Sequence, residues 1–130
     1  MTNEEKIQHW INLSDRDLET AEWVMKGGYN LHAGYMCHQA VEKILKGYFA
    51  KIKEDTPPLT HDLTALAQKT ELYNLMDEQQ KGFIRVLNPM NIEARYPDYK
   101  NKIAQTMTKN VTQNILINTK ELLLWIKQRM

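Results

Sequence analysis

The chain has 130 residues, enough for one domain with a hydrophobic core but too few for two. Its net charge of +1 excludes a general attraction to nucleic acid or membrane, so any phosphate contacts must come from a few local side chains. A single cysteine, Cys37, excludes an intrachain disulfide and is typical of a reducing compartment. Residues 1–10 contain no apolar signal segment, and residues 115–126 are too polar and too short a run to span a membrane. We therefore expect a cytoplasmic protein.

Glycine and proline cluster at residues 26–30, 54–62 and 88–98, and apolar residues recur at helical spacing between these clusters. The alternating β-branched pattern of strands is missing. The sequence therefore predicts a single all-α domain over residues 1–130, an up-and-down bundle of about five helices.

The first helix is predicted from Asn3 to Lys26, with an apolar stripe that contains Asp17 in its middle. The stripe consists of Ile7, Trp10, Leu13, Ala21 and Val24. Because an unpaired buried carboxylate is costly, we expect Asp17 to lie at the rim or to pair with a lysine of a neighbouring helix.

The second helix is predicted from Leu31 to Lys53 and has two distinct faces. The core face collects Gly34, Cys37, Val41, Ile44, Leu45, Tyr48 and Ile52. The opposite, polar face collects His32, Tyr35, Gln39, Glu42, Lys43 and Lys46. His38 lies at the edge between the two faces, and Cys37 is interpreted as a core thiol.

Three further helices follow the double proline. A short one is predicted to run to Leu72, with Thr60 or Asp62 as its N-cap. Another runs from Asp77 to Leu87, and the last covers Lys100 to Gln128. From Ile115 onward the last helix is apolar around most of its circumference, which predicts that a second subunit covers it.

Several kinds of chemistry are excluded by the motifs that are missing. The chain has no glycine-rich phosphate loop, no CxxC and no GxSxG. His38 and Glu42 have the i, i+4 spacing of two metal ligands, but no second pair of this kind occurs, so we predict no metal and no cofactor. Cys37 and His38 point about 100° apart on a helix and do not form a catalytic dyad.

The polar residues that remain form three groups. Gln39, Glu42, Lys43 and Lys46 lie on the second helix, His61 and Asp62 follow the double proline, and Arg95, Tyr96 and Tyr99 precede the last helix. The first group is either a solvated face with an ordinary Glu42–Lys46 pair or a ligand site on a rigid element. The other two suit anion binding and base stacking, which favours a ligand site built from all nine residues.

Three stretches taken together, "HAGYMCHQAVEKILKGYF", "PPLTHDLTAL" and "EARYPDY", resemble the HEPN domain family, and in particular its small stand-alone prokaryotic members. The family's QAxEKxxKA-like signature is matched by Gln39, Ala40, Glu42, Lys43 and Lys46, with Gly47 in place of the usual alanine. The resemblance implies a helical bundle, commonly a homodimer, that is often encoded beside a minimal nucleotidyltransferase in a two-component, toxin–antitoxin-like system.

The resemblance also implies a comparison with the many HEPN proteins that are metal-independent ribonucleases, which use an arginine and a histidine separated by four to six intervening residues. In this chain Arg95 is followed by Lys100, Asn101 and Lys102 where that histidine is expected. The resemblance therefore implies nucleotide binding without catalysis, in a homodimer that partners a nucleotidyltransferase. The alternatives are a ribonuclease with an atypical site around Arg95, which would also bind RNA, and a module that only binds other proteins.

Overall fold

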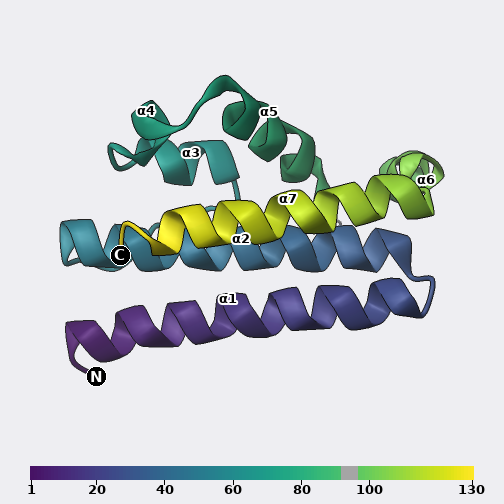
Figure 1. Ribbon diagram of the computed structural model, residues 1–130. Helices are drawn as coiled ribbons and strands as arrows, with labels where there is room; N and C mark the ends of the chain where they lie inside the picture. The colour runs from purple at the N-terminus through teal and green to yellow at the C-terminus, as the bar shows by residue number, and fades with distance from the viewer. Residues whose placement is uncertain (92–96) are drawn as a thin grey trace.

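A computed structural model describes residues 1–91 and 97–130 (Figure 1). The described residues form seven α-helices and one 3₁₀ turn, with no strand, which confirms the all-α prediction. The elements are α1 (Asn3–Lys26), α2 (Asn30–Lys53), α3 (Leu63–Gln68), α4 (Leu72–Leu75), α5 (Glu78–Leu87), η1 (Asn88–Met90), α6 (Pro97–Thr106) and α7 (Lys109–Lys127). None of the described helices is long and apolar enough to cross a membrane.

The α1 helix has the bounds predicted from the sequence, because both of its ends are specified locally. At its start, the Thr2 side chain accepts a hydrogen bond from the Glu5 backbone N–H, and the Glu5 carboxylate accepts one from the Thr2 N–H. At its end, Gly28 has a φ of 85°, a left-handed conformation that favours glycine. This turn reverses the chain directly into α2.

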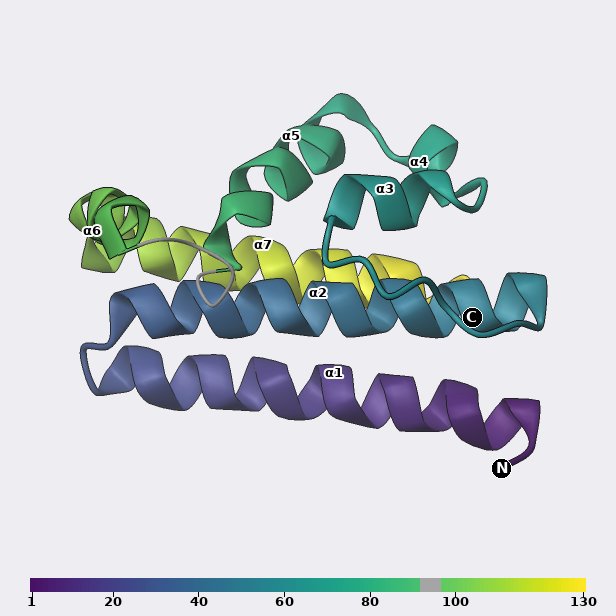
Figure 2. The same ribbon diagram turned by 180° about the vertical axis from the view of Figure 1, so that it is seen from behind.

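The three long helices α1, α2 and α7 lie side by side, and α3, α4 and α5 cover the same side of α2 and α7 (Figures 1 and 2). The α1 and α2 helices are antiparallel, whereas α7 runs in the same direction as α2 after the chain returns through α3–α6. Six of the seven predicted core-face residues of α2 are buried. Ile52 is the exception, with 41% of its surface exposed, because it lies in the last turn of the helix.

Two predicted helices differ from the structure. The third ends at Gln68 as α3, four residues earlier than predicted, with Asp62 rather than Thr60 as its N-cap, and a separate short helix, α4, which was not predicted, follows a turn at Lys69–Glu71. The last becomes α6 and α7, which are separated at Met107 and Thr108. The Thr108 side chain accepts a hydrogen bond from the Val111 N–H and starts a new helix there.

Candidate functional site

Glu42, in the middle of α2, is the centre of a buried polar cluster. Only 3% of its surface is exposed, and its Oε2 accepts a hydrogen bond of 3.0 Å from the Lys46 ammonium one turn later. Lys46 is also buried, and its Nζ lies 5.9 Å from the centre of the Trp10 ring on α1. The predicted Glu42–Lys46 pair is therefore present, but it lies inside the protein rather than on a solvated face.

His61 covers this cluster from the loop before α3. Its Nδ1 lies 2.9 Å from Oε1 and 3.1 Å from Oε2 of Glu42. Since a carboxylate accepts hydrogen bonds, Nδ1 carries the proton and Nε2 faces away from Glu42. The His61 side chain is 58% exposed, whereas that of Glu42 is 4% exposed. The buried carboxylate thus orients an imidazole whose other nitrogen is open to a ligand.

Asp62, the residue after His61, stabilises the start of α3. Asp62 caps α3 by accepting a hydrogen bond of 3.1 Å from the Ala65 N–H, and it accepts another of 3.0 Å from the Asn88 amide. The Asn88 hydrogen bond, together with that from Ala65, holds the pKa of Asp62 below its ordinary value. The Asn88 Oδ1 in turn accepts a hydrogen bond from the Leu63 N–H. These bonds fix the loop that carries His61.

Lys43 belongs to a second network, on the side of α2 that faces α1. Its Nζ donates a hydrogen bond of 2.5 Å to Asp17 and lies 3.4 Å from the Gln39 Oε1. The prediction that Asp17 pairs with a lysine of a neighbouring helix is therefore confirmed. Because Asp17 balances its charge, Lys43 makes a weaker contact for an anion than a free lysine would.

His38 lies one turn before Glu42 and is completely buried, although the sequence pattern put it at the edge of the core. Its ring nitrogens make no hydrogen bond of ordinary geometry among the described residues, although the His61 backbone and the Asn88 side chain lie near enough to raise its pKa slightly, and its Nδ1 is 3.9 Å from Glu42 Oε1. Burial lowers the pKa of His38 from 6.5 to about 4. His38 is thus a neutral imidazole behind the Glu42 carboxylate. In the sequence, the i, i+4 spacing of His38 and Glu42 already indicates that the two side chains lie on the same face of the helix.

Metal binding has no support in the described ranges 1–91 and 97–130. These residues contain no group of three His, Cys, Asp or Glu side chains placed to hold a metal ion. Around Glu42 the structure brings together the hydrogen-bonding groups of His61 and one buried cation, Lys46.

The HEPN domain profile matches residues 7–129 of the chain. This chain belongs to the HEPN family. Its fold is similar to that of TT1696 from Thermus thermophilus, with a TM-score of 0.81 and 19% identity over 96% of this chain and 98% of that one. It is also similar to ST0689, an archaeal HEPN homologue, with a TM-score of 0.72 and 19% identity over 95% and 96% of the two chains. No curated protein matches the chain.

In this HEPN chain the signature residues of α2 belong to the two networks around Glu42 and Asp17, and the "THDL" residues cover the first of them. Tyr99 lies on α6, near the start of α2, whereas Glu42 lies in the middle of α2 (Figure 1). At that end the Asn30 side chain donates a hydrogen bond to the Met107 carbonyl. Arg95 and Tyr96 fall outside the described residues, so their predicted roles stay predictions.

Proposed function

We propose that this HEPN protein binds a nucleotide or a nucleotide-bearing ligand beside His61, without catalysis. The observation that supports the proposal is the orientation of His61 by the buried Glu42 carboxylate, which leaves Nε2 directed away from the cluster. When both ring nitrogens of His61 carry a proton, Nδ1–H stays on Glu42 and Nε2–H is a donor that suits a phosphate. The charges of Glu42, Lys46 and the protonated His61 then sum to +1, which favours a bound anion.

The proposal gives the nine predicted ligand residues different tasks. His61 contacts the phosphate directly, and Arg95 neutralises it. Tyr96 or Tyr99 stacks on the base. Glu42 and Lys46 act through His61, whereas Gln39 and Lys43 supply a weaker contact because they are already bonded to each other and to Asp17. Asp62 holds the loop in place through its helix cap.

Calorimetric titration with ATP tests this proposal. We expect binding at millimolar concentration or below, and at least a roughly tenfold loss of affinity in His61→Gln, since a hydrogen bond to a charged group is worth about 1.5–3 kcal/mol. His32→Gln is the matched control because His32 is an exposed histidine of α2 that lies outside the cluster. The absence of heat with wild-type protein, or equal affinities for wild type and His61→Gln, would contradict the proposal.

We further propose that the protein is a homodimer and that it works with a minimal nucleotidyltransferase in a two-component system of the toxin–antitoxin kind. The family resemblance supports both statements. Sedimentation velocity at micromolar concentration tests the first, and co-purification with a nucleotidyltransferase encoded beside this chain tests the second. A monomer at all concentrations, or separate elution of the two proteins, would contradict them.

A second candidate function is metal-independent cleavage of RNA around Arg95. The oriented His61 favours it, because Nε2 is able to accept the proton of a ribose 2′-hydroxyl as that oxygen attacks the neighbouring phosphorus. The P–O5′ bond then breaks, and the 5′-oxygen leaves with a proton taken from water, which gives a 2′,3′-cyclic phosphate and a free 5′-hydroxyl. Incubation with single-stranded and structured RNA in EDTA distinguishes this candidate. Cleavage that is lost in both Arg95→Ala and His61→Gln would support it over binding alone, and intact RNA would exclude it.

A third candidate is a module that binds only other proteins. It is favoured by the internal pairing of the α2 polar face, where Lys43 bonds Asp17 and Lys46 bonds Glu42. This candidate predicts no heat with ATP and no RNA cleavage. The two experiments above therefore separate all three functions.

A further inference from the structure

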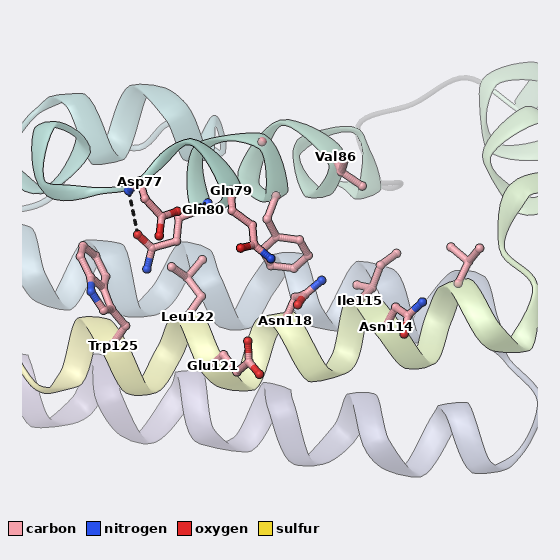
Figure 3. Close-up of a pocket in the computed structure, with 13 residues that line it drawn as sticks. Asp77, Gln79, Gln80, Val86, Asn114, Ile115, Asn118, Glu121, Leu122 and Trp125 are labelled. Atoms are coloured by element: carbon pink, nitrogen blue, oxygen red, sulfur yellow. Dashed lines mark hydrogen bonds between the residues drawn. The ribbon is translucent and has the colours of Figure 1, made fainter.

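A groove separates α5 from α7 on the side of the molecule away from α1 (Figure 3). Its volume is about 580 Å³. The apolar lining comes from both helices and consists of Phe83, Val86, Val111, Ile115, Leu122 and Trp125. Val86 is 55% exposed and Val111 41% exposed, so the apolar surface continues from the floor of the groove to its rim. A contiguous apolar surface of this kind is typical of an interaction site.

The polar lining combines unpaired amides with carboxylates. Gln79, Asn114 and Asn118 point into the groove and make no hydrogen bond within the described part of the chain. Asp77 and Glu121 add two negative charges, although Asp77 also caps α5. Among the described residues that line the groove there is no Lys, Arg or His. The groove is therefore apolar at its floor, acidic at its rim and rich in free amide donors and acceptors.

The length of the groove matches a helix. Its lining extends along α7 from Val111 to Trp125, about four turns or roughly 21 Å at 1.5 Å per residue. An amphipathic helix that enters such a groove uses apolar anchors spaced three, four and seven residues apart. Arg129 already stacks on Trp125, with its guanidinium carbon 3.9 Å from the ring centre, which leaves Phe83, Ile115 and Leu122 as the open floor.

The charge of the groove selects among its potential occupants. A nucleotide phosphate would approach two carboxylates and no lining cation, which is unfavourable. A second copy that used the same face about a two-fold axis would bring two acidic rims together, each with Asp77 and Glu121 and no lining cation. A helix that carries lysine or arginine beside its apolar stripe would instead meet opposite charges at the rim.

We propose that the α5–α7 groove docks a basic amphipathic helix of a partner protein. The apolar stripe of that helix packs on Phe83, Ile115 and Leu122. Its lysines or arginines pair with Asp77 and Glu121, and its polar flanks bond the free amides of Asn114 and Asn118. This inference stands apart from nucleotide binding at His61, because the groove contains none of the residues of the Glu42 cluster.

Three synthetic 16-residue peptides test the proposal against the full chain. The first has leucines at helical spacing flanked by lysines, the second replaces each lysine with glutamate, and the third scrambles the order of the first. We expect the lysine peptide to bind, the glutamate peptide to bind at least about tenfold more weakly, and the scrambled peptide not to bind. Amide NMR shifts should map the first peptide to α5 and α7, and its affinity should fall as salt is added.

Variants of exposed residues provide the controls. Val86→Lys should abolish binding of the lysine peptide, since it puts a like charge on the apolar rim, whereas Leu59→Lys should not, because Leu59 is 91% exposed and lies outside the groove. Glu121→Lys brings the sum of the two rim charges from −2 to zero and should abolish the preference for the lysine peptide, while Glu19→Lys on α1 should leave that preference unchanged. Equal binding of the lysine and glutamate peptides, or no binding of either, would overturn the proposal. A wild-type dimer that dissociates in Val86→Lys but not in Leu59→Lys would assign the groove to a second copy instead.

Discussion

Removing one partner of the Glu42–Lys46 pair should cost more stability than its i, i+4 spacing suggests, because the pair is buried. An exposed i, i+4 pair contributes about 0.3–0.5 kcal/mol, whereas removing one partner of a buried pair costs about 3–5 kcal/mol because the other charge stays buried. The sequence predicted the pair from its spacing alone. It did not predict the burial, because the covering residue, His61, is 19 positions further along the chain and its place depends on the tertiary fold.

His38 makes the stability of the protein depend on pH. Burial lowers its pKa from 6.5 to about 4, so between these values the unfolded chain binds a proton that the folded chain does not. Stability is therefore highest above pH 6.5 and falls on acidification. We expect His38 alone to lower the free energy of unfolding by about 2 kcal/mol between pH 7 and pH 5.

Urea denaturation of His38→Leu at the two pH values measures this contribution. The variant keeps a side chain of similar volume and should lose about 2 kcal/mol less than wild type on acidification. Asp62 and Glu71 also have lowered pKa values and weaken the fold at acid pH, but they do so in both proteins. His9→Leu, at an exposed position of α1, should behave like wild type. Equal pH dependence in His38→Leu and wild type would show that His38 is protonated in the folded state.

At the scale of the helices, local signals explain what the sequence predicted well. The start of α1 is specified by Thr2 with Glu5, and its end by Lys26 with Gly27 and Gly28. The division between α6 and α7 was not predicted, because neither glycine nor proline occurs at Met107–Thr108. A threonine in the middle of an apolar pattern is a weak signal until the backbone around it is known, since threonine is tolerated inside helices.

Thr108→Ala should destabilise the protein by about 1 kcal/mol, the usual cost of removing an N-cap side chain. The reason is that the Val111 N–H loses its acceptor, which lies 3.2 Å away. Thr108→Asp should restore most of this loss in urea denaturation, because aspartate is also a good N-cap. Thr56→Ala, in an exposed loop, is the control. No difference between Thr108→Ala and Thr108→Asp would indicate that the α7 cap contributes nothing to stability.

At the scale of the whole molecule, the cover formed by α3, α4 and α5 shares one core with the long helices. Leu66 and Ile84 from the cover belong to the same buried cluster as Ile44 and Leu123. A polar contact also joins the cover to the long helices, since the Tyr48 hydroxyl on α2 donates a hydrogen bond of 2.5 Å to Glu71. Burial, together with this bond, raises the pKa of Tyr48 to about 12. We therefore expect a single cooperative unfolding transition.

Leu66→Ala tests whether the cover and the long helices unfold together. The side chain is 1% exposed, so its truncation should cost about 2–5 kcal/mol. The three tryptophans lie on α1 and α7; in a Trp125→Phe background, which removes the one that lines the α5–α7 groove, the fluorescence of Trp10 and Trp23 reports on α1 of the long helices alone. The midpoint should shift equally by fluorescence and by circular dichroism, and Leu75→Ala, at a position 53% exposed, should shift neither. A fluorescence midpoint that does not move would show that the cover unfolds separately.

The α5–α7 groove was not predicted from the sequence, although the apolar character of one of its two helices was. The pattern of the last helix predicted that a second subunit covers it, and this stays a prediction; Ile117 and Leu124 are 47% and 59% exposed in the single chain. The groove itself needs Phe83 and Val86 beside Ile115 and Leu122, and nothing local relates segments about 30 residues apart.

The tight turn at Gly27–Tyr29 also affects how easily different parts of the fold assemble. The α1 and α2 helices share the most extensive contact of any two helices, yet only three residues separate them, so little loop-closure entropy is lost when they pair. The α7 helix must instead return to α2 across the whole stretch from Glu54 to Thr108. The first helical hairpin is therefore the part of this bundle with the lowest contact order, and the docking of α7 is the step that closes the longest loop.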